Sequence, residues 1–189
     1  MKCPRCVQVI HRGAEVCPHC AFSLSAADEL YGTEGPEIER LDDKAGLMTR
    51  HAHDHVQRAI DHFERKFPQL WFAVHTGRPP RGGDLRQHGF WLLNRANFTD
   101  LQTGRSREGG VLLVIDPDAR QAGMTWGYRL DGHLGEDDTF LALSRAHAYW
   151  VEEHYADGIV RVIQELTRVL IKRARRAKRL GRRRKGGAA

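Results

Sequence analysis

The feature that most constrains the fold is an uninterrupted apolar run, Val111 to Ile115, followed by a turn and a second strand pattern. Five consecutive aliphatic side chains leave this strand without a polar face. The sequence therefore predicts that both faces are covered, as in a sheet that lies between helices. Asp116-Pro117-Asp118 supplies the turn, because proline fixes φ and the carboxylates bond nearby backbone N–H groups. Residues 122–130 then alternate heavy apolar side chains with small or polar ones, which predicts the second strand of a hairpin.

The remaining apolar patterns alternate between helices and strands. A helix capped by Thr49 precedes a strand at Leu70–Val74, and a helix capped by Asp84 leads to the central strand. Because strand, helix and strand in this order imply a right-handed crossover, these two strands should be parallel. The hairpin adds an antiparallel strand, so the sheet is predicted to be mixed. Two further helices follow, the second of which starts at Asp157.

Four cysteines, the only ones in the chain, form two C-x-x-C pairs separated by ten residues: Cys3, Cys6, Cys17 and Cys20. Four thiolates in paired turns can surround one tetrahedral Zn²⁺, and a segment of about 24 residues is too short to hold a core without such a staple. Residues 1–24 therefore resemble a short bacterial zinc ribbon with a structural zinc. Disulfides or a redox pair are the alternative, and His11 or His19 could replace a thiolate.

The charge of the chain is concentrated at its end. The formal net charge is +6, and residues 172–185 hold ten Lys or Arg and no acid, so the remainder carries −4, which is +6 minus +10. The tail, residues 172–189, is predicted to bind polyanions through Lys172 to Lys185, with nucleic acid or an anionic membrane surface as the partner. A solvated, solubilising tail is the alternative, because no aromatic residues are interleaved to stack on bases.

Other segments set the predicted location and domain organisation. No run of 18 or more apolar residues exists, and the N-terminus lacks the apolar region of a signal peptide, which predicts a cytoplasmic protein without a transmembrane segment. Residues 25–37 lack a sustained period and contain Ser, Gly, Glu and Pro. They are predicted to be a linker that lets the ribbon move independently of a main domain at 38–171.

The helix predicted after Thr49 carries four histidines: His51, His53, His55 and His62. His51 and His55 are one helical turn apart and could bind a metal ion. A solvated, histidine-rich helix face is the default interpretation.

Several motifs in order resemble one known family. GGVLLVIDPDAR followed by GYRLDGHL is similar to the core of the TPM domain, a phosphatase-like domain. LDDKAGLMT, WLLNRANF and HYADGIVRVIQELTRVL are similar to the family's opening, middle helix and last helix, so the resemblance covers roughly residues 40 to 171. It implies an α/β/α sandwich. It also implies cation binding in some members, acid phosphatase activity in others, and roles in the assembly or repair of membrane complexes.

The resemblance also implies an acidic site near the strand ends. Glu108-Gly109-Gly110 stands where the family often has Asp-Asn-Gly, and Asp42 matches the acid at the start of the domain. Asp131 and Asp137 fall on the acidic positions after the hairpin. Glu108, Asp131 and Asp137 are therefore candidates to hold a hard cation, Ca²⁺ or Mg²⁺. For Asp137 the alternative is that an acid in the first turn of a helix simply favours the helix dipole.

Two classes of function remain. In the first, the chain is a binding or adaptor protein whose ribbon and tail contact partners, including an unidentified protein, while the sandwich is a platform. In the second, it is a divalent-cation-dependent, phosphatase-like hydrolase. The sequence has no complete catalytic motif: it offers no Ser-His-Asp order, no cysteine nucleophile outside the ribbon and no Gly-rich phosphate loop. The first class is therefore favoured.

Overall fold

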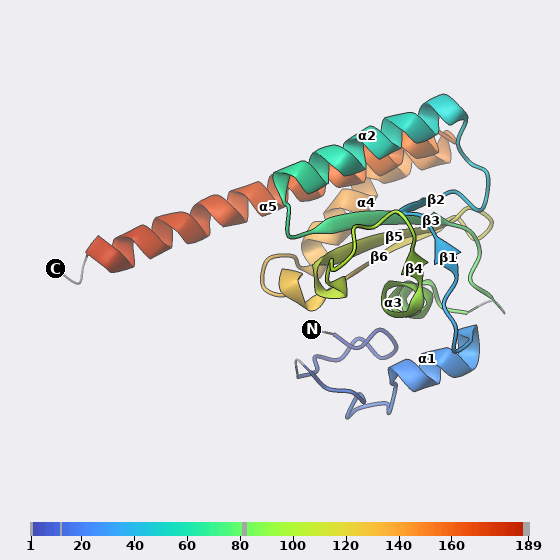
Figure 1. The fold of residues 1–189 in the computed structure, drawn as a ribbon, viewed down its shortest axis with the longest axis horizontal. Helices are drawn as coiled ribbons and strands as arrows, with labels where there is room; N and C mark the ends of the chain where they lie inside the picture. Colours follow the sequence, from blue (N-terminus) through green and yellow to red (C-terminus); the bar gives the residue numbers. More distant parts are fainter. Residues whose placement is uncertain (1, 12, 81–82, 187–189) are drawn as a thin grey trace. The chain divides into compact units, whose positions relative to one another are not determined.

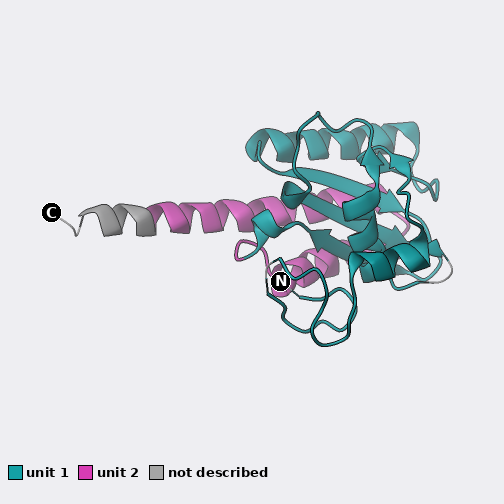
Figure 2. Ribbon diagram, turned by 60° about the horizontal axis from the view of Figure 1, so that its bottom comes forward, with its two compact units in different colours: residues 1–131 teal, residues 132–189 magenta. Residues whose placement is uncertain are grey.

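The computed structural model describes residues 2–11, 13–80 and 83–186. It divides into two compact units, Met1–Asp131 and Gly132–Ala189 (Figure 2). The first unit contains the cysteines, the sheet and the helices that cover it. The second contains a pair of helices.

Within the described residues of the first unit, four strands form a mixed sheet in the order β2-β3-β5-β6 (Figure 1). Strands β2 (Leu41–Asp42), β3 (Trp71–Thr76) and β5 (Gly110–Asp116) are parallel, and β6 (Gln121–Trp126) is antiparallel to β5. Every residue of β5 is buried, which confirms the prediction drawn from its apolar run. Strand β3 extends two residues beyond the prediction and includes the buried polar residues His75 and Thr76.

Helices cover both faces of this sheet. Helix α2 (Arg50–Lys66) packs Phe63 against Phe72 of β3, with ring centroids 5.6 Å apart. Helix α3 (Leu85–Arg95) contributes Trp91 to a buried cluster that also contains Trp71 of β3. Trp71 and Phe72 are neighbours in this strand, so their side chains point to opposite faces of the sheet. The α/β/α sandwich is therefore confirmed (Figure 1).

Side-chain caps fix the start of both helices. The Thr49 hydroxyl accepts a hydrogen bond from the Ala52 N–H at 3.3 Å, and Asp84 Oδ1 accepts from the N–H groups of Arg86 and Gln87 at 3.0 Å. These are the two caps that the sequence predicts.

Residues 25–37, predicted to be a linker, are ordered against the sheet-covering helix α3. They include most of helix α1 (Leu24–Tyr31) and lead into β1 (Glu37–Ile38), which pairs in parallel with β4 (Asn97–Phe98). The Asp28 carboxylate receives two hydrogen bonds from Arg95, at 2.9 and 2.5 Å, and Trp91 Nε1 donates to the Gly32 carbonyl at 2.9 Å. Composition does not predict this docking, because it depends on contacts with distant residues of α3 and not on a local pattern.

The second unit consists of α4 (Glu136–Val151) packed against α5 (Tyr155–Gly186). Glu165 of α5 is 5% exposed and pairs with Arg145, Arg161 and Arg168. Helix α5 continues into the segment predicted to be a basic tail, where the side chains of residues 180–189 lie outside those described. No helix among the described residues combines the length and apolar character that a membrane crossing needs.

Candidate functional site

The four cysteine sulfurs form a compact cluster in the N-terminal segment. All four lie within 4.8 Å of one another, with Cys3 and Cys20 sulfurs 3.7 Å apart and Cys6 and Cys17 sulfurs also 3.7 Å apart. A disulfide requires about 2.05 Å. Sulfurs placed about 2.3 Å from a tetrahedral ion lie about 3.8 Å from one another. The cluster can therefore bind a metal ion, and its geometry does not fit the disulfide alternative.

The two halves of the cluster share one backbone design. The Val7 N–H donates to the Cys3 carbonyl at 3.0 Å, and fourteen residues later the Ala21 N–H donates to the Cys17 carbonyl at 2.9 Å. Val7 and Ala21 both adopt the left-handed region, with φ of 63° and 57°. That conformation costs roughly 1–2 kcal/mol at a non-glycine residue, so ligation of the sulfurs gives a physical reason for two such turns.

The cysteines also differ in acidity. Burial raises the pKa of Cys17, but backbone N–H groups of His19 and Cys20 and the neighbouring thiols outweigh it and lower the pKa to about 6. At Cys20 the Phe22 N–H lowers the pKa, yet burial and the other cysteines raise it to about 12. Cys17 is therefore more acidic than Cys20, and because a metal ion binds thiolates, the cluster should bind it more tightly as the pH rises.

The cysteine cluster is joined to the core of the sandwich. Cys3 and Cys17 belong to the same buried cluster as Ala27 of α1 and Trp91 of α3. The rings of Phe22 and Phe90 meet edge to face, with centroids 5.7 Å apart. In the structure the cysteine segment is thus packed on α3 through α1, which differs from the independent movement predicted for it.

A second polar cluster lies at the carboxyl ends of β2 and β3, where sequence reasoning identified Asp42 but missed two histidines. His75 is 4% exposed, and its Nδ1 is 2.6 Å from Asp42 Oδ2. The His88 ring of α3 lies 5.6 Å from the His75 ring and is 3% exposed. Its Nδ1 has no hydrogen-bond partner among the described residues. The signal in the sequence was weak, because His75 only ends an apolar run and His88 sits alone inside a helix.

The surroundings of His88 keep it neutral. Its ring lies 5.1 Å from that of Tyr31 and stacks on Trp91 at 6.0 Å. Burial lowers the pKa of His88 to about 4, and the charges of His75 and Lys44 act in the same direction.

This lowered pKa predicts a pH dependence of stability. The unfolded chain takes up a proton at His88 near pH 6.5, whereas the folded chain does so only at about pH 4. The contribution of neutral His88 to the free energy of unfolding is fully present above about pH 6.5. It is lost progressively as the pH falls towards 4, which lowers the free energy of unfolding by up to about 3 kcal/mol. Urea denaturation of the wild type and of His88→Phe across this range measures it. We expect the variant to lose less stability towards acid pH, and parallel curves for the two proteins would contradict the account.

The acidic residues implied by the family resemblance occupy different places. Glu108 lies exposed in the short turn η2 (Arg107–Gly109), and Asp131 follows the neighbouring turn η3 (Tyr128–Leu130) and is half-buried. Asp137 lies exposed in the first turn of α4, in the second unit. Glu108 stands at the amino end of β5, whereas open α/β sheets usually bind ligands beyond the carboxyl ends of their parallel strands. Among the described residues, the cysteines are the one group of three or more Cys, His, Asp or Glu side chains close enough to share an ion.

The histidines of α2 lie towards solvent. His51, His55 and His62 are exposed, and His53 is half-buried. This arrangement agrees with the interpretation of a histidine-rich surface.

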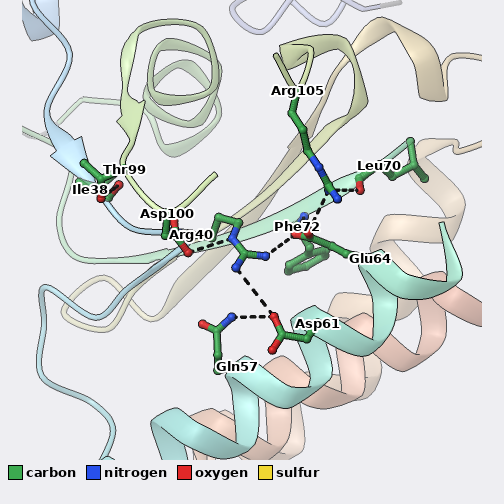
Figure 3. Close-up of polar contacts among 10 residues, drawn as sticks. All are labelled: Ile38, Arg40, Gln57, Asp61, Glu64, Leu70, Phe72, Thr99, Asp100 and Arg105. Carbon is green, nitrogen blue, oxygen red and sulfur yellow. Dashed lines mark hydrogen bonds and ion pairs between the residues drawn. The ribbon is translucent and has the colours of Figure 1, made fainter. Parts of the chain in front are cut away.

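A pocket of about 410 Å³ lies near the amino end of β3 and is lined mainly by charged residues: Arg40, Asp61, Glu64, Arg65, Asp100 and Arg105. Figure 3 shows that the charged groups of Arg40 and Arg105 point towards the carboxylates of Asp61, Glu64 and Asp100. Glu64 accepts hydrogen bonds from Arg40 at 2.7 Å, Arg105 at 2.9 Å and the Phe72 N–H at 3.3 Å. Because the acids and arginines neutralise each other, we interpret this network as a structural tie between α2, the sheet and the loop that follows β4.

Comparison with known proteins agrees with this fold. The sequence profile of the TPM domain matches residues 41–169. The chain belongs to the TPM-domain family. No curated protein matches it.

Two solved structures share the fold of this TPM-domain protein. The N-terminal domain of a P. gingivalis protein has 21% identity and a TM-score of 0.51, over 79% of this chain and 91% of that one. The N-terminal domain of the cg2496 protein from Corynebacterium glutamicum has 17% identity and a TM-score of 0.53, over 71% of this chain and 83% of that one. At these identities the likeness concerns the fold alone.

Proposed function

We propose that this TPM-domain protein is a cytoplasmic binding or adaptor protein, in which a zinc-stabilised ribbon and a basic helix present partner surfaces on an α/β platform. The observation that carries the proposal is the four-sulfur cluster inside a core shared with α3. Thiolates in tetrahedral sets of four favour Zn²⁺, and four protein ligands leave no coordination position for a substrate. The metal therefore has a structural role in this proposal.

The exposed charges of α5 support a polyanionic partner. Most basic side chains in the first part of the basic segment are exposed: Lys172, Arg175, Arg176, Lys178 and Arg179. Arg173 pairs with Asp138 at 2.7 Å, and no acidic residue follows Glu165 in the sequence. A run of exposed cations suits phosphate groups, whether in nucleic acid or at an anionic membrane surface.

Reversing these charges is expected to weaken binding to RNA, DNA or anionic vesicles by at least about tenfold and to flatten its salt dependence, because each lost phosphate contact reduces counterion release. The test variant carries Glu at Lys172, Arg175, Arg176 and Lys178. The matched control carries Glu at four exposed basic residues of α2, namely Arg50, Arg58, Arg65 and Lys66.

Retention of both variants on each ligand, measured across a salt series, distinguishes the outcomes. Loss in the α5 variant alone supports the proposal, and the ligand that is lost identifies the partner class. Equal, weak retention of the wild type and both variants would mean that the basic segment only aids solubility.

The phosphatase-like hydrolase remains the alternative. It rests on the family resemblance, and a hard cation held by Glu108, Asp131 and Asp137 stays a prediction.

A further inference from the structure

We propose that His75 and His88 form a second metal site, which takes a transition-metal ion such as Zn²⁺, Co²⁺ or Ni²⁺ and is separate from the cysteine cluster. The site lies at the carboxyl ends of β2 and β3, where open α/β sheets commonly bind ligands. It does not depend on the proposed function, because none of its residues belongs to the ribbon or to α5.

His75 is oriented as metal-binding histidines usually are. Its Nδ1 lies 2.6 Å from Asp42 Oδ2, the contact by which a carboxylate orients a neutral imidazole so that its Nε2 can bind a metal ion. A Cβ at Gly77 would lie 3.5 Å from Nε2, so this nitrogen faces the loop that leaves β3 and not the apolar core. Asp42 thus acts as a positioning residue that fixes the tautomer and the ring orientation.

His88 supplies the second nitrogen. The residue is 3% exposed and its Nδ1 has no partner among the described residues, whereas buried polar atoms are nearly always hydrogen-bonded or otherwise satisfied. Two imidazoles on one tetrahedral ion, with nitrogens about 2.1 Å from the metal, have ring centres about 5 Å apart. The observed separation of 5.6 Å, with the ring planes at 76° to each other, is close to this value.

The remaining chemistry of the site sets its character. The positive charge of Lys44 would repel a bound metal ion, but the Lys44 side chain is exposed and can turn towards solvent. Two protein nitrogens make the site weaker than the cysteine cluster, which offers four sulfur ligands.

The test uses the full chain with its cysteines already saturated with zinc. Titration with Ni²⁺ by calorimetry should show one further equivalent, and Co²⁺ should give the weak visible bands of nitrogen and oxygen ligands without new thiolate charge transfer. His75→Gln and His88→Phe should each weaken this binding by at least about tenfold, and Asp42→Asn by about tenfold or more. His88→Phe keeps an aromatic ring between Tyr31 and Trp91, so a preserved melting temperature rules out misfolding as the cause.

The exposed histidines of α2 provide the control. His51→Gln should leave the second equivalent unchanged. Binding that is lost in His51→Gln but kept in His75→Gln would place the ion on α2 and overturn the proposal. A zinc-saturated chain that takes up no second equivalent would also overturn it, and would show His88 to be a packing residue alone.

Discussion

Replacing Cys17 with Ser is expected to release the ribbon metal and to lower the melting temperature of the protein by roughly 5–10 °C, since a loss of about 2–3 kcal/mol has this effect in a chain of this size. The effect should extend beyond the ribbon because Cys17 is 3% exposed and shares its buried cluster with Ala27 and Trp91. Metal ligation and folding are one process in such small segments. Removal of one sulfur should therefore loosen α1 as well.

Hydrogen exchange locates this loss. Backbone amides of α1 should exchange faster in Cys17→Ser than in the wild type, while those of β5 should not. Val16→Thr is the matched control, because Val16 adjoins the same turn but is 54% exposed. Faster exchange confined to residues 1–22, with α1 unchanged, would restore the independent linker that composition predicts and contradict the docked ribbon.

Glu64→Gln is expected to destabilise the protein by about 1.5–3 kcal/mol, because it weakens charge-assisted hydrogen bonds from both Arg40 and Arg105. The Glu64 side chain is 11% exposed and serves both Arg40 and Arg105. Glutamine keeps the size and one acceptor but removes the negative charge that holds two guanidinium groups together. Chemical denaturation of the purified variant measures the change.

Asp61→Asn is the control for that measurement. Asp61 lies 3.8 Å from Arg40 and is 42% exposed, so its loss should cost less than about 1 kcal/mol. If the two substitutions cost the same, the network of Figure 3 is a surface feature and not a structural tie.

Local signals in the sequence predicted most of the sandwich. Val111 to Ile115 can only be a strand covered on both faces, and Thr49 and Asp84 cap helices through their own side chains. The C-x-x-C spacing likewise predicts a sulfur cluster, because each pair is a turn of a few residues. These features depend on neighbours along the chain, which a single sequence displays.

The features that were missed depend on contacts between distant residues. Asp28 meets Arg95 across 67 positions, and His75 meets Asp42 across 33. Neither pair has a periodic or spacing signal. The sequence alone therefore predicts a linker where α1 lies and gives no sign of His75 and His88 at the sheet edge. The family resemblance implies a shared site for Glu108, Asp131 and Asp137, which lie in η2, directly after η3 and in the first turn of α4, and this site stays a prediction.

The central claim is that four cysteines hold a structural zinc in a ribbon that is part of the folded unit. Elemental analysis of the full-length protein, purified without added metal or chelator and paired with a thiol count, tests it most directly. The account predicts one zinc per chain and four thiols that react only after a chelator removes the metal. A protein that contains no metal, with four freely reactive thiols and an N-terminal segment open to proteases, would contradict it.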